Sequence, residues 1–202
     1  MSRGRFITLE GIDGAGKSTH LEGIGEFLRS RGKDAVVTRE PGGTPLGEKL
    51  RTVLLAQAMT AETEALLMFA ARREHIVQVI APALAAGRWV VSDRFTDATY
   101  AYQGAGGGMA KARIALLERW VNGGLVPDLT LVFDLPVELA LTRLPRDRRD
   151  RFESENRAYF ERVRAGYLAR IAAEPRRMRI VDAARPLSEV KKEVENIIST
   201  IC

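Results

Sequence analysis

The chain has 202 residues, of which 46% are hydrophobic and 28% are charged, and its formal net charge is +5. This is typical of a soluble globular protein with one well-buried domain. A single cysteine, Cys202, excludes a disulfide framework or a cysteine-based zinc site within one chain and favours a cytoplasmic location. We expect no membrane association, because no uncharged apolar run is long enough to cross a bilayer and no apolar signal region precedes the first predicted strand.

Short apolar runs alternate with longer helix-like segments, without an internal repeat or a low-complexity linker. The predicted strands are Phe6–Glu10, Ala35–Thr38, Arg88–Ser92, Thr130–Asp134 and Met178–Val181. The predicted helices are Lys17–Arg31, Leu46–Ala56, Glu62–Ala85, Lys111–Asn122, Val137–Arg143, Glu153–Ala173 and Leu187–Thr200. This alternation is typical of βα units. We therefore expect a single domain over residues 1–202, with a five-stranded parallel sheet in a three-layer α/β/α fold and ligands at the carboxyl ends of the strands.

A glycine-rich turn lies between the first predicted strand and the first predicted helix. Its sequence, Gly11-Ile-Asp-Gly-Ala-Gly-Lys-Ser18, fits the phosphate-binding pattern G-x-x-x-x-G-K-[ST]. Glycines let backbone N–H groups point at phosphate oxygens, Lys17 supplies positive charge, and the Ser18 hydroxyl can ligate Mg²⁺. A chance match is the alternative, but the flanking strand and helix favour a nucleoside triphosphate site of the P-loop NTPase type. The residues expected there are Gly11, Ile12, Asp13, Gly14, Ala15, Gly16, Lys17, Ser18 and Thr19.

The second predicted strand is followed by Arg39-Glu-Pro-Gly-Gly-Thr44. Pro-Gly-Gly is turn chemistry, which alone would explain the segment. An arginine at a strand end, on the same edge as the phosphate-binding loop, is also well placed to bind a second anion. Spacing alone leaves these two interpretations equal.

Two pairs of residues, Phe69 with Arg72 and Thr99 with Tyr102, are each three residues apart. This spacing places both members of a pair on one helical face. Phe69 can stack on a base and Arg72 can donate to a base carbonyl, although a helical phenylalanine is more often a core residue. The same ambiguity applies to the second pair.

The third predicted strand is followed by Asp93-Arg94. The carboxylate can hold a water on Mg²⁺, and the guanidinium can neutralise the phosphate of an acceptor. A surface ion pair in a loop is the alternative. The position at the end of a buried strand favours the functional interpretation.

The segment from Arg143 to Glu153 is rich in arginine. Alternating charge is usually a solvated surface, but beside a triphosphate site it indicates a short lid over about residues 143–153, whose guanidinium groups close over the transferring phosphoryl group. Because the arginines gather here rather than along a helix face, we expect small polyphosphate ligands and no nucleic acid. The two histidines, His20 and His75, have no obvious site, and each is expected to be a surface or helix residue.

Together these segments resemble the bacterial thymidylate kinases, which are P-loop nucleoside monophosphate kinases, over essentially the whole chain. The resemblance rests on Glu10-Gly-Ile-Asp-Gly-Ala-Gly-Lys-Ser18, Arg39-Glu-Pro-Gly-Gly43, Leu67-Met-Phe-Ala-Ala-Arg72, Asp93-Arg94 and Ala101-Tyr-Gln-Gly104. The Arg-Glu-Pro-Gly-Gly segment with Asp-Arg is much more discriminating than the phosphate-binding loop. The resemblance implies a homodimeric enzyme of dTTP biosynthesis that transfers the γ-phosphoryl group of ATP to dTMP, with Mg²⁺, giving ADP and dTDP.

The resemblance also implies roles for single residues. Lys17 and Ser18 would hold the ATP phosphates and Mg²⁺, Asp93 would support the metal, and Arg143 would lie beside the adenine. The residues implied for dTMP are Asp13 at the 3′-hydroxyl, Arg39 and Arg94 at the phosphate, Phe69 and Arg72 at thymine, Thr99 near N3 and Tyr102 against the sugar. Gly14-Ala15 replaces an arginine found in one branch of the family, so the catalytic arginine is expected in the lid. The residues implied in catalysis are Lys17, Arg94, Arg148 and Arg151, with Arg146 and Arg149 as alternative lid arginines.

Two other functions remain open from the sequence. One is a kinase of the same architecture that acts on a different nucleotide or nucleoside. The other is a GTPase-like switch whose arginine segment contacts nucleic acid. The sequence lacks the guanine-reading pattern N-K-x-D, and this disfavours the switch.

Overall fold

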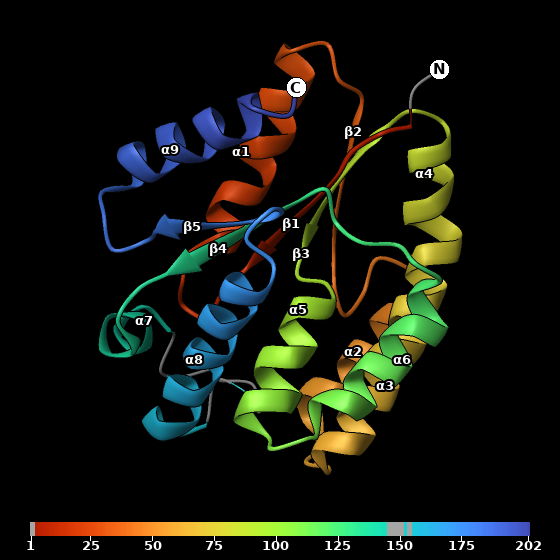
Figure 1. Cartoon of the computed structure of the whole chain (residues 1–202), viewed down its shortest axis with the longest axis vertical. Coiled ribbons are helices and arrows are strands. Elements are labelled where there is room, and N and C mark those ends of the chain that lie inside the picture. Colours follow the sequence, from red (N-terminus) through yellow and green to blue (C-terminus); the bar gives the residue numbers. More distant parts are fainter. Residues whose placement is uncertain (1–2, 145–151, 153–154) are drawn as a thin grey trace.

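The computed structural model describes residues 3–144, 152 and 155–202. Within them, five parallel strands form one sheet in the order β2-β3-β1-β4-β5 (Figure 1). Their bounds are Phe6–Glu10 for β1, Ala35–Arg39 for β2, Trp89–Asp93 for β3, Leu129–Asp134 for β4 and Met178–Asp182 for β5. The predicted five-stranded parallel sheet is therefore confirmed, with strand bounds within one residue of the prediction.

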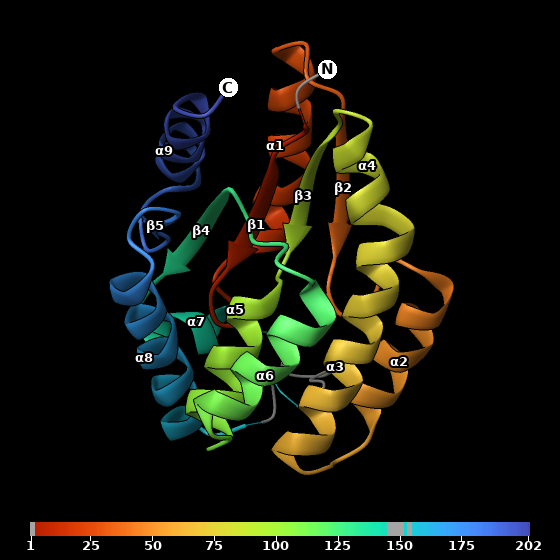
Figure 2. The same cartoon turned by 45° about the vertical axis from the view of Figure 1, so that its right-hand side comes forward.

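Helices cover both faces of the sheet (Figures 1 and 2). The described α-helices are α1 Lys17–Ser30, α2 Pro45–Ala56, α3 Ala61–His75, α4 Ala81–Ala85, α5 Thr96–Thr99, α6 Lys111–Asn122, α7 Val137–Arg143, α8 Arg157–Ala173 and α9 Leu187–Ser199. Two π-helical segments are η1 Ile76–Ile80 and η2 Tyr100–Gly106. α1 and α9 lie on one face, whereas α4, α5 and α8 lie on the other, and α2, α3 and α6 pack together beside the carboxyl ends of β2 and β3. Among the described residues, none of the helices has the length and apolarity needed to traverse a membrane.

The central strand β1 contributes to the packing on both faces of the sheet. All of its residues are buried, and successive side chains point to opposite faces. Ile7 and Leu9 join the large core that includes residues of α1 and α9, whereas Phe6 joins a smaller core with Ile80 beneath α4. Burial on both faces explains the continuous apolar composition of this strand.

Two predicted helices differ from the structure. The predicted helix Glu62–Ala85 is divided into α3, η1 and α4, because Pro82 has no N–H for the carbonyl of Gln78 and the backbone widens into a π turn just before it. The predicted helix Glu153–Ala173 begins instead at Arg157, where the Asn156 side chain caps the helix by accepting from the backbone N–H of Tyr159 at 3.0 Å. The segments α5 and η2 were not predicted, because they are short and have no amphipathic period.

A buried carboxylate joins α5 to α8 and to the start of β5. Asp97 is 1% exposed, and it accepts hydrogen bonds from Arg170 Nε at 2.9 Å and from Arg177 Nη1 at 2.7 Å. Burial acts to raise the pKa of Asp97, but the hydrogen bonds and positive charges of Arg177 and Arg170 outweigh it and hold the pKa below its usual value. This ion cluster therefore stabilises the folded state most when the carboxyl group is ionised.

We expect Asp97→Asn to lower the free energy of unfolding by about 3 kcal/mol, because it leaves two arginines beside a buried neutral group. Urea unfolding at about pH 7 measures this difference. The pKa of Asp97 is lower in the folded state than in the unfolded state. Its contribution to the free energy of unfolding is therefore complete above the unfolded-state pKa and is lost as the pH falls through the folded-state pKa. The difference in stability between wild type and Asp97→Asn should accordingly shrink in acid. The matched control is Asp34→Asn, in the exposed pair with Arg88, which should change stability less. Equal losses for both variants would contradict the cluster's role.

Candidate active site

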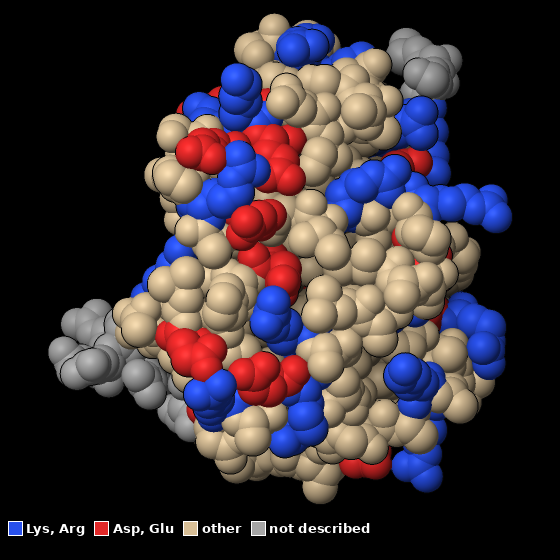
Figure 3. Space-filling model, turned by 60° about the vertical axis from the view of Figure 1, so that its left-hand side comes forward, with Lys and Arg blue, Asp and Glu red and all other residues tan. Residues whose placement is uncertain are grey.

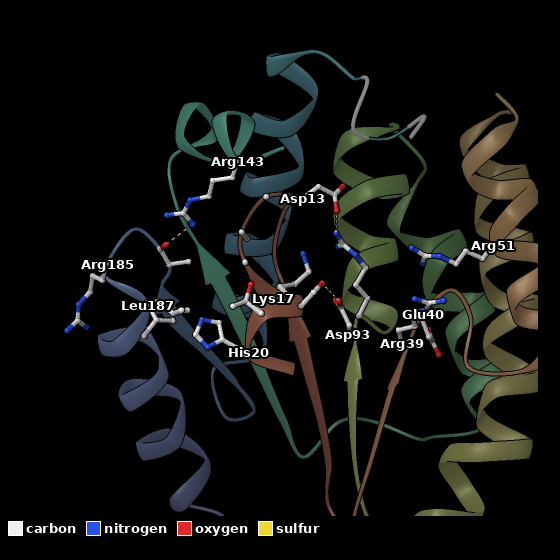
Figure 4. A pocket seen from close by; sticks show the side chains of 18 residues that line it. Asp13, Lys17, His20, Arg39, Glu40, Arg51, Asp93, Arg143, Arg185 and Leu187 are labelled. Atoms are coloured by element: carbon white, nitrogen blue, oxygen red, sulfur yellow. Dashed lines mark hydrogen bonds and ion pairs between the residues drawn. The ribbon is translucent and has the colours of Figure 1, made fainter. Parts of the chain in front are cut away.

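A cavity of about 630 Å³ opens at the carboxyl ends of the strands. Figure 4 shows its two ends and its centre. Arg143, Arg185, Leu187 and His20 lie at one end, whereas Arg39 and Arg51 lie at the other. The phosphate-binding loop crosses the middle, as the topology of a parallel sheet predicts. Of the loop residues predicted at the site, Asp13 to Thr19 line this cavity.

Gly11 and Ile12 contribute to the loop through their backbone. Their carbonyl oxygens each accept a hydrogen bond from Lys17 Nζ at 3.0 Å. Burial lowers the pKa of Lys17 to about 8, and the positive charge of Arg94 adds to the effect. The ammonium group is therefore held at the bottom of the loop in a position where an anion would restore its usual pKa.

The loop glycines adopt conformations that L-residues avoid. Gly14 has φ +79°, and a Cβ on it would lie 2.2 Å from the carbonyl oxygen of Ala140 in α7. Gly16 has φ +85°, but open space surrounds the position of its missing Cβ. Backbone conformation thus requires glycine at both positions, and close approach to α7 requires it at Gly14 as well.

The structure brings the predicted metal ligands together. Ser18 Oγ donates to Asp93 Oδ2 at 3.1 Å, and Asp93 Oδ1 is buried without a hydrogen-bond partner among the described residues. A hydroxyl and a carboxylate, with one carboxylate oxygen still unpaired, are hard oxygen donors of the kind that Mg²⁺ prefers. The side-chain oxygens of Ser18 and Asp93 therefore fit Mg²⁺ as ligands.

Arg94 follows β3 and links several elements. Its backbone has φ +72°, an unusual conformation for a residue with a side chain. Nη1 donates to Gly11 O at 3.0 Å and to Tyr167 Oη at 2.9 Å. Nη2 donates to an oxygen of Asp13 and to Tyr102 Oη, and Tyr102 Oη in turn donates to the second oxygen of Asp13 at 2.9 Å. The predicted residues Asp13, Arg94 and Tyr102 thus form one hydrogen-bonded group.

Behind this group lies Glu10, which the sequence analysis did not select. It accepts from the backbone N–H of Phe95 and from Tyr167 Oη, both at 2.8 Å. Burial, together with the negative charge of Asp97, raises the pKa of Glu10 to about 8 despite the nearby Arg94. Its apolar neighbours in β1 gave no signal of a functional role.

A second, smaller cavity of about 80 Å³ adjoins the first. Arg72, Thr99 and Tyr102 line it, as predicted. Phe69 does not line it within the described part of the chain: its side chain is 1% exposed and packs in the core with Ala65 and Ile114. The predicted stacking position of Phe69 is therefore corrected. Met68 lines the cavity instead, because its four-residue spacing from Arg72 places it on the same helical face.

Four residues line both cavities, namely Asp13, Glu40, Arg51 and Arg94. Arg51 was not predicted, because nothing in the sequence of α2 distinguishes it from other surface arginines. It donates to the carbonyl oxygen of Pro41 at 3.2 Å. The predicted Arg39 lines the larger cavity, where it pairs with Glu48 at 2.9 Å.

The far end of the large cavity is formed by α7, the segment after β5 and the start of α9. Arg143 lies there as predicted and donates to the carbonyl oxygen of Ala183 at 3.1 Å. Leu187 and His20 line the same end. His20 is in a helix, as expected, but it is buried, at 7% exposed. The predicted lid residues Arg146, Arg148, Arg149 and Arg151 lie outside the described residues.

Comparisons with known proteins agree with one another. The family model described as "Thymidylate kinase" matches residues 9–194. The chain is 62% identical to a thymidylate kinase of Cupriavidus metallidurans, over 98% of this chain and 100% of that protein. It is 59% identical to one of Methylobacillus flagellatus, over 97% of both. A crystal structure of thymidylate kinase from Ehrlichia chaffeensis superimposes with a TM-score of 0.81 and 34% identity, over 98% of this chain and 99% of that one.

Gly14 and Gly16 provide a test of the close packing of the phosphate-binding loop on α7. We expect Gly16→Ala to cost about 1–2 kcal/mol of stability, the strain of a left-handed residue with a Cβ. Gly14→Ala should cost more, because its Cβ would also collide with the backbone of α7. Denaturant unfolding of both variants gives the difference. If the two losses were equal, the close packing of the loop on α7 would be refuted.

Proposed function

The chain belongs to the thymidylate kinase family, and we propose which role each site residue has in the reaction. The protein is a nucleoside monophosphate kinase that transfers the γ-phosphoryl group of ATP to dTMP. The observation that carries the proposal is the pair of adjoining cavities. Asp13, Glu40, Arg51 and Arg94 line both of them, beside the phosphate-binding loop. Such a junction allows the reacting phosphates of two nucleotides to meet.

ATP occupies the large cavity in this proposal. Its phosphates lie on the backbone of the loop from Gly11 to Thr19 and on Lys17, at the amino terminus of α1, where the helix dipole also favours negative charge. The adenine lies at the end formed by Arg143, Ala183 and Leu187. The geometry of Arg143 supports this, because its guanidinium is anchored on the Ala183 carbonyl and can cover a planar base.

Mg²⁺ would be held by Ser18 and by Asp93, the latter directly or through water. When bound, the ion neutralises charge on the β- and γ-phosphates. The Ser18 to Asp93 hydrogen bond and the unpaired Asp93 oxygen support this assignment. The side chains themselves contribute a fixed pair of oxygen ligands beside Lys17.

The acceptor dTMP occupies the small cavity and the adjoining end of the large one. Its phosphate contacts Arg39 and Arg94, its 3′-hydroxyl contacts Asp13, and Tyr102 packs against the sugar. Arg72 donates to the O4 atom of thymine, Thr99 lies near N3, and Met68 packs on the face of the base. These assignments are supported by the lining of the cavity and by the donors of Arg72, of which Nη1 and Nη2 lie 3.3 Å from Thr99 Oγ1.

The attacking atom is a phosphate oxygen that already carries negative charge, so the reaction needs no strong general base. Positioning and neutralisation of charge suffice. Lys17 and Arg94 supply part of the positive charge. We assign the rest to lid arginines Arg148 and Arg151, on the basis of sequence.

A homodimer is supported by an exposed apolar face on α3 and α6. Leu66 is 56% exposed, Leu116 60% and Trp120 79%. Exposed apolar side chains of this size are typical of an interface between protein chains. None of these three residues lines either cavity, so their burial in a dimer would leave each site complete.

We also place the enzyme in the cytoplasm, as its free Cys202 and the family's substrates suggest. Nucleic acid is not among the proposed partners. On the face shown in Figure 3, basic and acidic side chains are interspersed rather than gathered into one basic track. Arg185, at the rim of the large cavity, is itself paired with Glu189 at 2.7 Å.

The assignment of the acceptor is tested by measuring ADP release with Mg·ATP and dTMP, dUMP, UMP, dCMP, dAMP or dGMP in turn. We expect strong turnover with dTMP, weak turnover with dUMP and little with the others. Lys17→Ala should lose most turnover while remaining folded. Preference for another acceptor would overturn the roles of Met68, Arg72 and Tyr102, and guanine-nucleotide binding without acceptor-dependent turnover would favour the switch.

The dimer is tested by sedimentation velocity. Trp120→Glu places a charge on the most exposed of the large apolar side chains of α3 and α6, so we expect it to shift the protein from dimer to monomer at micromolar concentration. A matched control is Val126→Glu, at an exposed apolar residue beyond the end of α6. A wild-type chain that sediments as a monomer would refute the homodimer.

A further inference from the structure

His75, the last residue of α3, is completely buried and lies outside both cavities in the described part of the chain. It was expected to be a surface or helix residue; it is in a helix, but it is not at the surface. No step of the proposed function uses it. A buried polar side chain is retained only if its hydrogen bonds are satisfied, so its partners indicate its role.

The partners of His75 form a chain that leads to the acceptor cavity. His75 Nδ1 lies 2.9 Å from Glu40 Oε1, and Glu40 Oε2 accepts from Arg72 Nε at 2.7 Å. On its other side, His75 Nε2 lies 2.7 Å from Thr38 Oγ1 of β2. The histidine thus connects the sheet to the carboxylate that holds Arg72.

Groups on both sides of this hydrogen-bonded series restrict movement of the His75 ring. A Cβ on Gly43 would lie only 2.6 Å from His75 Nε2, so the backbone of the Pro-Gly-Gly turn closes over the ring. Glu40 is 5% exposed and Arg72 is 2% exposed. Burial acts to raise the pKa of Glu40, but Arg72 and His75 together hold it below its usual value, so the carboxylate is ionised.

Apart from its hydrogen bonds to Glu40 and Thr99, Arg72 contacts two aromatic rings that do not fix its orientation. Its guanidinium carbon lies 4.6 Å from the ring centre of Phe69 and 5.1 Å from that of Phe95. Attraction between a cation and a ring face is not directional enough to decide which N–H points into the cavity. The hydrogen bond from Nε to the Glu40 carboxylate, at 2.7 Å, fixes one edge of the guanidinium, and the longer bonds from Nη1 and Nη2 to Thr99, at 3.3 Å, hold the other edge at the cavity.

We propose that His75 is a positioning residue for recognition of the acceptor base. It donates from Nδ1 to Glu40, which sets the carboxylate that orients Arg72, and Arg72 then presents its N–H donors to a carbonyl oxygen of the base. This inference rests on the proposed function, in which the acceptor base occupies the small cavity. The role is distinct from catalysis, because His75 touches neither substrate.

The test compares four variants by steady-state kinetics with ATP and with dTMP or dCMP as acceptor. His75→Leu removes both hydrogen bonds, His75→Asn keeps an amide donor near the position of Nδ1, and His75→Gln keeps one near that of Nε2. Glu74→Gln is the control, because it changes a partly exposed neighbour on the same helix that pairs only with Gln78 among the described residues.

We expect His75→Leu to raise the KM for dTMP about tenfold while the KM for ATP changes less than about twofold, since one hydrogen bond to a charged group is lost. The ratio of kcat/KM for dTMP to that for dCMP should fall by a similar factor, because the amino group of cytosine replaces the carbonyl that Arg72 reads. His75→Asn should recover most of both losses, whereas His75→Gln should not. Glu74→Gln should behave as wild type.

If His75 had only a structural role, its substitutions would lower the stability measured by thermal unfolding. They would not change the ratio of kcat/KM for dTMP to that for dCMP, and His75→Asn and His75→Gln would behave alike. That outcome would overturn the inference. If His75→Leu does not fold, the comparison of His75→Asn with His75→Gln decides alone. Failure of the proposed function is distinguishable, because the wild-type chain itself would then show no preference for dTMP.

Discussion

The guanidinium of Arg94 holds together the two halves of the site. It reaches a backbone carbonyl at the end of β1, Asp13 in the phosphate-binding loop, Tyr102 in η2 and Tyr167 in α8. The loop, η2 and α8 are far apart in the sequence, and Arg94, directly after β3, lies where they meet. Because a buried cation is stable only with nearby acceptors, the network fixes the loop relative to the acceptor cavity.

Burial of charge explains most of the other features of the site. Lys17 and Glu10 lie deep enough that desolvation moves each pKa to about 8, from opposite directions. Glu40 and Asp97 stay ionised although buried, because Arg72 and His75 contact Glu40 and two arginines contact Asp97. Basic side chains nevertheless outnumber acidic ones in the lining of the large cavity, and polyphosphates would complement this charge.

Met68 and Phe69 are both large, apolar and helical. A helical phenylalanine is more often a core residue, and the place of Phe69 beside a base was implied only by the resemblance to the family. The helix turns by about a hundred degrees per residue, so that Phe69 enters the core and Met68 faces the cavity with Arg72. His75 and Glu10 were not selected as site residues, because only the partners that other elements bring to them show a further role.

The sequence by itself determined the fold class, the strands, the phosphate-binding loop and the edge of the sheet at which the large cavity opens. These properties depend on local patterns, because apolar runs, glycine turns and strand ends are set by neighbouring residues. The contacts of Arg94, the chain from His75 through Glu40 to Arg72, the place of Arg51 and the choice of Met68 over Phe69 were decided only by the tertiary structure. They depend on how α2, α3 and α8 pack beside the sheet. Residue spacing indicates which side chains share a helical face, but not which face the packing turns toward the cavity.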